Sequence, residues 1–449
     1  MKRFITDDTR TMEESSVSWR PTLSTPEMNL VKAYPTVLHQ QFVGMGAALT
    51  EASGYVFAQM DAETRKRFLD LCFGADGSRY SLCRLSIQSC DFSLTPRAYA
   101  NPPRKKGETA CDFSIEDDWA YVLPLVKAAQ ETNPQLQFLA SPWSPPAWAK
   151  TNRNMKYGGH LRSSHYGTWA DIVARALDAY RQAGVPIDRI TVQNEPNARQ
   201  TWESCLFNAK QEATFLHDHL KGALEAHGLG HVKTFIWDHN KEGAVDRAMA
   251  VMADPDVAAD VDGVAFHWYS GDHFEAVRAV RDLIGPDREL IFTEGCDYHS
   301  DGNDWAARQH AEHYAHEIIG DLEAGANGIL DWNILLDAQG GPNHVGNFCD
   351  APIMYDCESG QLNVRRPFYY LQHFSKFIAP GARHMLVTRY FEEIETCGFV
   401  NPDGSCALVV LNRYDHPVPF DLTLGNTSRL GTRIAHLDAP ARSIQTICW

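Results

Sequence analysis

The chain has 449 residues, of which 44% are hydrophobic and 22% are charged, and its formal net charge is −16. This composition is typical of a globular enzyme. The strong negative charge argues against a surface that binds nucleic acid or an anionic membrane, and it suits a neutral substrate. The length suits one α/β barrel, which usually takes about 250 residues, together with a smaller module.

The middle of the chain alternates short apolar runs with helix-length segments. Strands are predicted at residues 42–49, 80–87, 137–141, 190–193, 233–237, 263–267, 290–293 and 328–332. Helices are predicted at residues 62–72, 117–131, 166–183, 209–227, 274–283 and 305–324. Eight strands in such an alternation predict the α/β class and a closed parallel (β/α)8 TIM barrel. An open doubly wound sheet is the alternative, but no Gly-x-Gly-x-x-Gly turn follows the first strand to support it.

Both ends of the chain are rich in β-favouring residues. Short alternating runs with turn residues between them extend over residues 381–449 and predict a small all-β sandwich. Similar pieces occur within residues 1–40, so we expect part of the N-terminus to pair with this module in one side domain. The predicted organisation is an N-terminal β segment at 1–40, a catalytic barrel at 41–380 and a C-terminal sandwich at 381–449.

Targeting features and cysteine usage indicate where the protein resides. The first eight residues lack the apolar core of a secretory signal, and no apolar run approaches the roughly 20 residues that cross a bilayer. The eleven cysteines have no metal-like spacing, and several, such as Cys72, Cys83 and Cys406, lie in apolar stretches. Buried, reduced thiols are therefore expected. We expect a cytoplasmic protein, or one exported without a signal peptide, with no integral membrane segment and no nucleic-acid partner.

Two glutamates follow apolar runs and are about a hundred residues apart. Glu195 lies in Val192-Gln193-Asn194-Glu195-Pro196, after the apolar run Ile190-Thr191-Val192, and Glu294 ends the run Leu290-Ile291-Phe292-Thr293-Glu294. Buried parallel strands deliver such residues to the carboxyl end of a barrel, where the chemistry of these folds takes place. Glycoside hydrolysis needs two carboxyl groups that flank one bond. The pair therefore points to an enzyme that cleaves a sugar linkage.

The other predicted strands also end in polar or aromatic groups. Any one of them could be a loop cap or a core residue, but such residues at seven strand ends favour an assembled site. The motifs are Ser89-Cys90-Asp91-Phe92-Ser93, Ser141-Pro142-Trp143-Ser144-Pro145-Pro146, Asn194-Glu195-Pro196, His267-Trp268-Tyr269, and Asp331-Trp332-Asn333 followed by Gly340-Gly341-Pro342-Asn343. In this order they resemble glycoside hydrolase family 30, and within it the bacterial glucosylceramidase-like members. The resemblance covers nearly the whole chain and implies a (β/α)8 barrel with a β-sandwich at its side.

The resemblance also implies roles for individual residues. Glu195 matches the family's acid/base, Glu294 its nucleophile, and Asn194 the residue that binds the 2-hydroxyl of the sugar. The remaining implied substrate-binding residues surround the terminal sugar or the nucleophile, and they are Asp91, Trp143, Trp332, Asn347, Arg84, His267 and Tyr269. Asp238 and Asn240 lie in a weaker match and are expected only near the acid/base.

The implied mechanism is double displacement with retention of configuration, which needs carboxyl groups about 5 Å apart. Glu294 must be ionised to attack, so we expect Arg84 or Tyr269 to favour its charged form. Glu195 must begin protonated, so we expect burial or the charge of Glu294 to raise its pKa. No metal or organic cofactor is required.

The expected substrate is a β-glycoside, either a small molecule or a glycolipid. Asp91, Trp143 and Trp332 favour a pocket for a terminal β-linked glucose, and glucosylceramide is a plausible natural substrate. A retaining β-xylosidase or β-1,6-glucanase of the same family is the alternative. A non-catalytic glycan- or glycolipid-binding protein is the alternative of another class, although the presence of both glutamates counts against it. The oligomeric state is left open.

Overall fold

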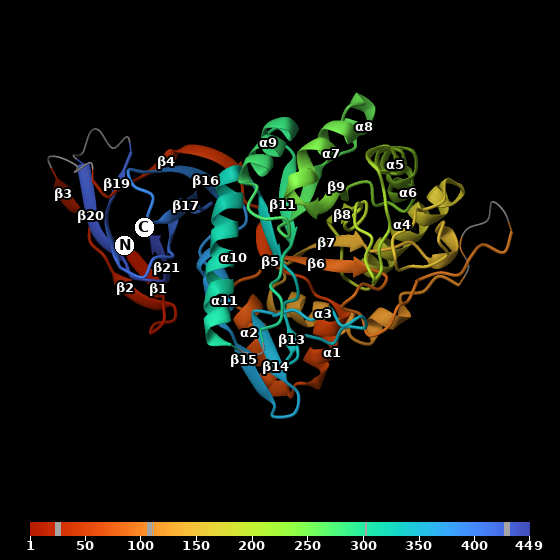
Figure 1. The fold of residues 1–449 in the computed structure, drawn as a ribbon, viewed down its shortest axis with the longest axis horizontal. Coiled ribbons are helices and arrows are strands. Elements are labelled where there is room, and N and C mark those ends of the chain that lie inside the picture. Colours follow the sequence, from red (N-terminus) through yellow and green to blue (C-terminus); the bar gives the residue numbers. More distant parts are fainter. Residues whose placement is uncertain (23–27, 106–109, 111, 301–302, 426–431) are drawn as a thin grey trace.

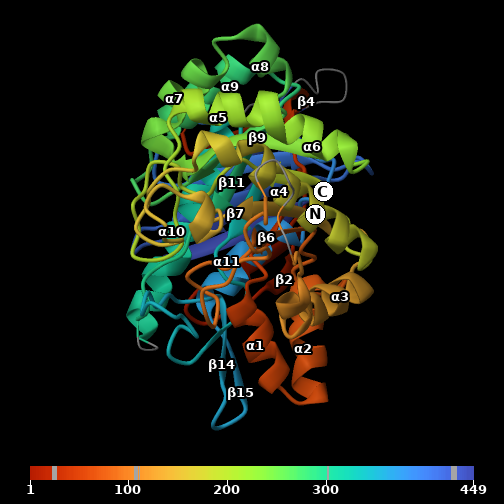
Figure 2. The same ribbon diagram turned by 90° about the vertical axis from the view of Figure 1, so that its right-hand side faces the viewer.

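The structure is a computed structural model that describes residues 1–22, 28–105, 110, 112–300, 303–425 and 432–449. It has two parts, a barrel with its surrounding helices and a β-rich part that holds both chain termini (Figure 1). Helices α10 (Asp304–Ala324) and α11 (Arg366–Ser375) lie between the two parts. Figure 2 views the molecule from the end that holds the barrel, and there the helices surround the barrel strands.

Eight parallel strands form the barrel, as the sequence predicts. In sheet order they are β5 (Gly44–Ala47), β12 (Gly328–Asp331), β11 (Glu289–Glu294), β10 (Gly263–His267), β9 (Lys233–Asn240), β8 (Arg189–Thr191), β7 (Gln137–Pro142) and β6 (Leu82–Ile87). The barrel is closed between β5 and β6 by two hydrogen bonds: the amide of Ser81 donates to the carbonyl of Met45, and the amide of Leu49 to the carbonyl of Arg84, each at 2.9 Å. The prediction of a TIM barrel is confirmed.

The helices agree with the predicted segments in part. Those in or near the predicted ranges are α2 (Ala62–Phe73), α3 (Val122–Thr132), α4 (Tyr166–Gln182), α5 (Ala209–Phe215), a π-helical turn at Leu216–Leu220, α6 (Lys221–Ala226), α9 (Phe274–Ile284) and α10. The prediction at 117–131 is wrong over its first residues, because a separate 3-10 turn occupies Glu116–Trp119. Elements that the sequence analysis missed are α1 (Glu51–Gln59), α7 (Ala244–Val251), α8 (Pro255–Ala259), α11, and a small sheet of β13 (Leu336–Asp337), β14 (Ile353–Asp356) and β15 (Gln361–Val364).

The β-rich part combines strands from both ends of the chain. Its strand order is β2 (Glu13–Ser16), β1 (Lys2–Thr6), β21 (Ser443–Cys448), β18 (Cys406–Asn412), β17 (Glu395–Val400), β16 (Arg383–Arg389), β4 (Leu30–Gln41), β19 (Val418–Leu424), β20 (Thr432–Ala439) and β3 (Arg20–Thr22). It encloses a core of its own that includes Val31, Leu408 and Phe420. The predicted side domain from both termini is therefore confirmed.

Buried hydrogen bonds join this part to the barrel helices. The imidazole of His373 on α11 contacts the hydroxyl of Thr446 on β21 at 2.8 Å and that of Thr6 on β1 at 2.9 Å. Both ring nitrogens of this buried histidine are thus satisfied, and burial lowers its pKa to about 3. A neutral ring bonded to two strands fixes α11 against the sheet.

The alternation of side chains along the barrel strands explains which residues reach the pocket. A buried cluster inside the barrel takes one residue from each of six strands, including Leu82, Ala265 and Ile291. Because strand side chains alternate with period two, Arg84, His267 and Thr293 point inward two residues later. The register of β9 shifts against β10 between Trp237 and His239, and Trp237 and Asp238 both have positive φ. This bulge turns Asp238 inward, as bulges beside active sites often do.

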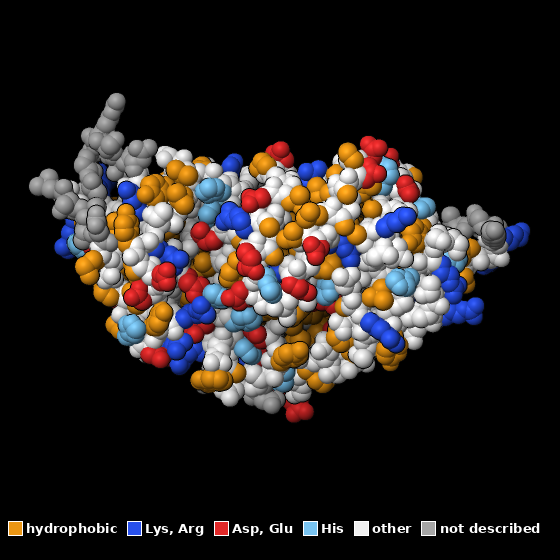
Figure 3. Space-filling view, turned by 45° about the horizontal axis from the view of Figure 1, so that its top comes forward, with side chains coloured by type: hydrophobic (Ala, Val, Ile, Leu, Met, Phe, Trp, Pro, Cys, Tyr) orange, Lys and Arg blue, Asp and Glu red, His pale blue; other side chains and the backbone are white. Residues whose placement is uncertain are grey.

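Other expectations concern the surface and the thiols. None of the described helices is long and apolar enough to span a bilayer. The ten described cysteines are unpaired, and most are buried, including Cys72, Cys83 and Cys406; Cys111 lies outside the described residues. Acidic and basic side chains are interspersed over the face drawn in Figure 3.

The closure of the barrel predicts a position that tolerates no side chain. A Cβ on Gly46 would lie 1.9 Å from the carbonyl oxygen of Leu82, so Gly46→Ala has to displace backbone at the β5–β6 junction. We expect a loss of more than about 2 kcal/mol in the free energy of unfolding, measured by urea denaturation. Gly222→Ala is the matched control, because nothing lies within 4 Å of its added Cβ, and it should stabilise α6 by about 0.5–1 kcal/mol. Equal stability of both variants would contradict the close contact.

Candidate active site

A pocket of about 290 Å³ opens at the carboxyl ends of the barrel strands, near the lower end of the range for small-ligand sites. Its lining residues are Asp91, Trp143, Asn194, Glu195, Gln200, Trp202, His239, Asn240, Tyr269, Glu294, Cys296, Tyr298, Trp332, Asn347 and Cys349. Eight of the ten residues that the sequence analysis assigned to the site belong to this lining. The other two, Arg84 and His267, lie directly behind it and are bonded to the two glutamates.

Arg84 is fully buried and joins several parts of the pocket. Its guanidinium donates to Glu294 Oε2 at 2.5 Å and to Asn194 Oδ1 at 2.8 Å. It also donates to Asp238 Oδ2 at 2.9 Å and to Ser141 Oγ at 3.1 Å. Because Arg84 occupies the amide oxygen of Asn194, the amide nitrogen of Asn194 is the end that can face a sugar hydroxyl.

Asp238 is the buried counterion of Arg84. Its Oδ2 also accepts hydrogen bonds from the hydroxyls of Ser141 at 2.9 Å and Thr191 at 2.7 Å. Its Oδ1 accepts one from Thr293 at 2.6 Å and lies 3.1 Å from His267 Nε2. Burial opposes ionisation, but the charge of Arg84 and these hydrogen bonds hold the pKa of Asp238 far below its usual range. Asp238 is therefore a permanent anion that orients Arg84 and His267.

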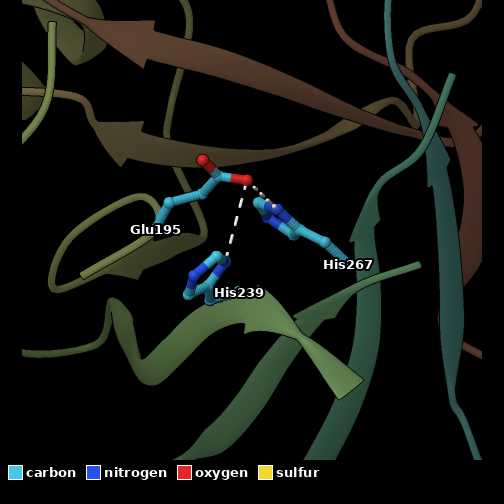
Figure 4. A group of neighbouring side chains, drawn as sticks. All are labelled: Glu195, His239 and His267. Atoms are coloured by element: carbon cyan, nitrogen blue, oxygen red, sulfur yellow. Dashed lines mark hydrogen bonds and ion pairs between the residues drawn. The ribbon is translucent and has the colours of Figure 1, made fainter. Parts of the chain in front are cut away.

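Glu195 lies in the pocket wall with three polar neighbours. Its Oε1 is 3.3 Å from His267 Nδ1 and 3.7 Å from His239 Nδ1, and its Oε2 accepts a hydrogen bond from Gln200 at 3.1 Å. Its backbone has φ of 46°, a left-handed conformation that costs a non-glycine residue about 1–3 kcal/mol and is frequent at functional sites. Figure 4 shows the carboxyl group directed at both histidines.

Glu294 occupies the other side of the pocket. In addition to Arg84, it accepts a hydrogen bond at Oε1 from the hydroxyl of Tyr269 at 3.1 Å. That hydroxyl also lies 3.5 Å from Cys296 Sγ, and Cys296 Sγ in turn lies 3.1 Å from Cys349 Sγ. The carboxylate is thus held at both oxygens, which fixes its direction.

The remaining wall combines aromatic faces with one carboxyl group. The rings of Trp143 and Trp332 are stacked at 5.2 Å, and the Arg84 guanidinium lies 4.7 Å from the centre of Trp143. Asp91 Oδ2 accepts a hydrogen bond from the Asn347 amide at 3.1 Å. Burial, with the charge of Glu294, raises the pKa of Asp91 to about 7. Such a wall offers apolar surface and hydrogen bonds, which is what a sugar ring needs.

The protonation of the two glutamates differs from what the sequence analysis predicts. Burial favours the neutral form of Glu195, but the hydrogen bond and charge of His267, with His239 and Gln200, lower its pKa to about 2. Burial raises the pKa of Glu294, and the charges of His267 and Arg84 only partly offset this. The expected raised pKa of Glu195 is therefore wrong. Arg84 does favour the charged form of Glu294, as expected, but burial outweighs it.

The proton that Glu195 lacks is carried by His267. Burial alone would lower the pKa of this imidazole, but the charge of Glu294 and the hydrogen bonds to Asp238 and Glu195 raise it to about 9. Nδ1 of His267, which carries a proton in this form, lies 3.3 Å from Glu195 Oε1. Glu195 and His267 thus hold one proton between them at neutral pH. The proton lies on His267, which is 72 positions away from Glu195 in the sequence.

Several residues of the site are not among the ten that the sequence analysis assigned to it. Gln200 and His239 both contact Glu195, and Trp202 and Tyr298 lie at the pocket wall. His239 stands between Asp238 and Asn240, which the analysis placed near the acid/base, so its position was accessible from that motif. Gln200 lies on an irregular loop, where no strand pattern indicates which side chains turn inward. Glu195, His239 and His267 are also the group of three potential metal ligands that the described residues contain.

Comparisons with known proteins agree with this geometry. Residues 42–378 match the glycosyl hydrolase family 30 TIM-barrel domain, and residues 381–447 match the family 30 beta sandwich domain. The lysosomal acid glucosylceramidase of Mus musculus is 30% identical over 94% of this chain and 83% of its own length. An endo-1,6-beta-D-glucanase of Trichoderma harzianum is 26% identical over 86% of this chain and 80% of its own.

A solved structure is similar over the whole chain. SrfJ from Salmonella typhimurium is 37% identical, with a TM-score of 0.95 over 100% of this chain and 99% of its own. The barrel with its side domain, the two glutamates in one pocket and the match of both family domains lead to one conclusion. The chain belongs to glycosyl hydrolase family 30.

Proposed function

We propose that this glycoside hydrolase releases a terminal β-linked glucose by double displacement, with Glu294 as the nucleophile and Glu195 as the acid/base. The observation that supports this most strongly is the single pocket that both carboxyl groups line, each held by its own set of hydrogen bonds. Glycoside hydrolysis requires two carboxyl groups that flank one bond, and a pocket that both groups line supports this.

The first step forms a bond between Glu294 and the anomeric carbon while the bond to the leaving oxygen breaks. Arg84 and Tyr269 keep the attacking carboxylate in place, so little reorientation is needed as the oxocarbenium-like transition state forms. The amide nitrogen of Asn194 is available to the 2-hydroxyl. In the second step water, deprotonated by Glu195, cleaves the glycosyl-enzyme ester and frees the sugar.

The proton for the leaving group comes from the Glu195–His267 pair. In the free site it lies on His267, and transfer across the 3.3 Å hydrogen bond places it on Glu195. The neutral imidazole that remains is stabilised because Asp238 accepts the hydrogen on its Nε2. Once Glu294 has attacked, it no longer carries a negative charge. That charge favoured a proton on both His267 and Glu195, so both groups now release a proton more easily. Glu195 can then act as the base.

The leaving group is proposed from the relatives. The similarity to a glucosylceramidase and to an endo-1,6-beta-glucanase supports a glucoside, either of a lipid alcohol or of a second glucose. Asp91 and Asn347 form a polar end of the pocket that suits a hydroxyl-rich sugar. A retaining β-xylosidase is the alternative within the family. A non-catalytic binding protein is disfavoured because both carboxyl groups are present and oriented.

Removal of either carboxylate tests the assigned roles. With an aryl β-glucoside as substrate, Glu294→Gln should reduce kcat to the limit of detection, and Glu195→Gln should reduce it by about 10²–10⁴-fold. Azide should restore turnover of Glu195→Gln, because a small nucleophile needs no deprotonation by Glu195, and the product should be the β-glucosyl azide. Wild-type product should first appear by NMR as the β-anomer. An α-anomer would contradict double displacement.

The pH profile tests the shared proton. His267 has a pKa of about 9, so kcat/KM should fall as the pH rises through 9, whereas the acid limb belongs to Glu294, which must be ionised and whose pKa burial raises. In His267→Asn the proton must reside on Glu195 itself, and the alkaline limb should move to lower pH. An unchanged limb would show that another group supplies the proton. His436→Asn, on the exposed surface of the side domain, is the control and should leave the profile unchanged.

Sugar selectivity tests the polar end of the pocket. Wild type should hydrolyse an aryl β-glucoside with a higher kcat/KM than the matched β-xyloside. Loss of a hydrogen bond to a charged group costs about 1.5–3 kcal/mol, so Asp91→Asn should lower kcat/KM for the glucoside roughly 10–150-fold. Asp403→Asn, in an exposed turn of the side domain, should have no effect. Preference for the xyloside would favour the β-xylosidase alternative.

A further inference from the structure

Three side chains from separate parts of the barrel meet at one point of the pocket wall. Glu195 follows β8, His239 lies on β9 and His267 ends β10, and their potential ligand atoms all lie within 4.8 Å of one another (Figure 4). The atoms concerned are Oε1 of Glu195, Nδ1 of His239 at 3.7 Å from it, and Nδ1 of His267 at 3.3 Å. Two imidazoles and a carboxylate are a common ligand set of zinc.

These separations match the edges of a zinc coordination shell. Zinc binds imidazole nitrogen and carboxylate oxygen at about 2.0–2.2 Å in a tetrahedral arrangement, so two ligands of one ion lie roughly 3.3–3.5 Å apart. The two distances from Glu195 are already within a few tenths of an ångström of this value. The ligand atoms of the two imidazoles lie within 4.8 Å of each other, so these two rings are the ones that have to approach.

His267 is oriented as a metal ligand would be. Its Nε2 lies 3.1 Å from Oδ1 of Asp238, which is the permanent anion beneath the pocket. A carboxylate that accepts the second ring hydrogen fixes the tautomer and makes the other nitrogen a better ligand, and metal-binding histidines usually have such a partner. With a neutral ring, the lone pair of His267 Nδ1 therefore points at Glu195.

His239 supplies an independent observation. Its Nδ1 is buried and has no hydrogen-bond partner among the described residues, since 3.7 Å to Glu195 exceeds hydrogen-bond length. A buried polar atom without a partner costs about 1–3 kcal/mol, and this one lies 3.7 Å from Glu195 Oε1. The proposed hydrolysis assigns no task to this atom.

The local charge also suits a divalent cation. When both histidines are neutral, the carboxylates of Glu195, Asp238 and Glu294 outnumber the single guanidinium of Arg84 by two. A divalent ion would balance this excess.

We propose that Glu195, His239 and His267 form a binding site for a divalent transition-metal ion of the zinc class, and that the bound ion inhibits the enzyme. The bound ion would occupy the carboxylate oxygen of Glu195 that has to carry the proton. It would also lie in the path of the leaving group. The binding does not depend on the proposed function. Only its inhibitory effect rests on Glu195 acting as the acid/base.

Direct binding tests the site. Metal-free protein is titrated with zinc chloride by calorimetry at pH 7.5, using wild type, His239→Gln and the surface control His436→Gln. We expect one zinc per chain in wild type, an affinity at least 10-fold lower in His239→Gln, and no change in His436→Gln. Thermal unfolding curves show whether His239→Gln is folded, and a folded variant that binds zinc as tightly as wild type would overturn the proposal.

The thiols of the same pocket provide a competing explanation that a second variant removes. Cys296 and Cys349, with sulfur atoms 3.1 Å apart, could also bind zinc, so Cys349→Ala is titrated in parallel. If Cys349→Ala loses the zinc and His239→Gln retains it, the ion belongs to the thiols and the proposal is wrong. Loss in His239→Gln with retention in Cys349→Ala supports it.

Inhibition is measured separately with an aryl β-glucoside. Zinc should inhibit wild type in the concentration range of its binding, a chelator should restore the rate, and the midpoint for His239→Gln, relative to its own zinc-free rate, should rise at least 10-fold. Zinc that binds through His239 without slowing turnover would overturn the inhibitory part alone. Wild type that binds zinc but hydrolyses no glycoside would contradict the proposed function and leave the metal site supported.

Discussion

The buried ion pair of Arg84 and Asp238 is the interaction on which the rest of the pocket depends. Removing two charges from water costs several kcal/mol per ion, and this cost is offset only when the surrounding hydrogen bonds are complete. Here Asp238 accepts bonds from Arg84, Ser141, Thr191 and Thr293 and contacts His267. The pair therefore links six of the barrel strands, β6 to β11, through polar contacts. The ion pair orients both glutamates: Arg84 bonds to Glu294, and Asp238 holds His267, which contacts Glu195.

This arrangement explains why Glu195, the proposed acid/base, is ionised in the free site. The network contains more carboxylates than cations, so it holds a proton, and the best place for that proton is the imidazole between Asp238 and Glu195. A carboxyl group in an apolar pocket would keep the proton itself. In this pocket His267 keeps the proton, one hydrogen bond away from Glu195.

The part of the structure that could be predicted is the part determined by local sequence. Each barrel strand is a short apolar run, because parallel strands are buried on both faces. Glu294 directly follows such a run, although a register shift between β10 and β11 sets it opposite His267. The bulge at Trp237 and Asp238 breaks the alternation. The predicted strand consequently ended at 237, whereas β9 continues to Asn240. The helix α1 was missed because glycine and serine within Glu51–Gln59 obscure its apolar face.

Protonation states could not be predicted for a different reason. The pKa of Glu195 depends on His267, which is 72 positions away in the chain and comes within 3.3 Å only when β8 and β10 are in place. The sequence indicates which ionisable groups share a barrel end, but the sign of each shift depends on distances of a few ångströms. The same holds for His239, whose neighbours in sequence were placed near the acid/base while its own contact with Glu195 was not foreseen.

The two sides of the pocket are built from different kinds of structure, and this bears on how selectivity for the leaving group can arise. Arg84, His267 and Glu294 lie on strands whose register is fixed by the barrel, so the chemistry at the anomeric carbon is tied to the fold. Gln200, Trp202 and Tyr298 come from irregular loops at the wall, and loops tolerate substitution far better than buried strands. Relatives that share the barrel while their names describe different substrates are consistent with this division. Selectivity for the leaving group can therefore change through the loops without disturbing the Arg84–Asp238 pair beneath them.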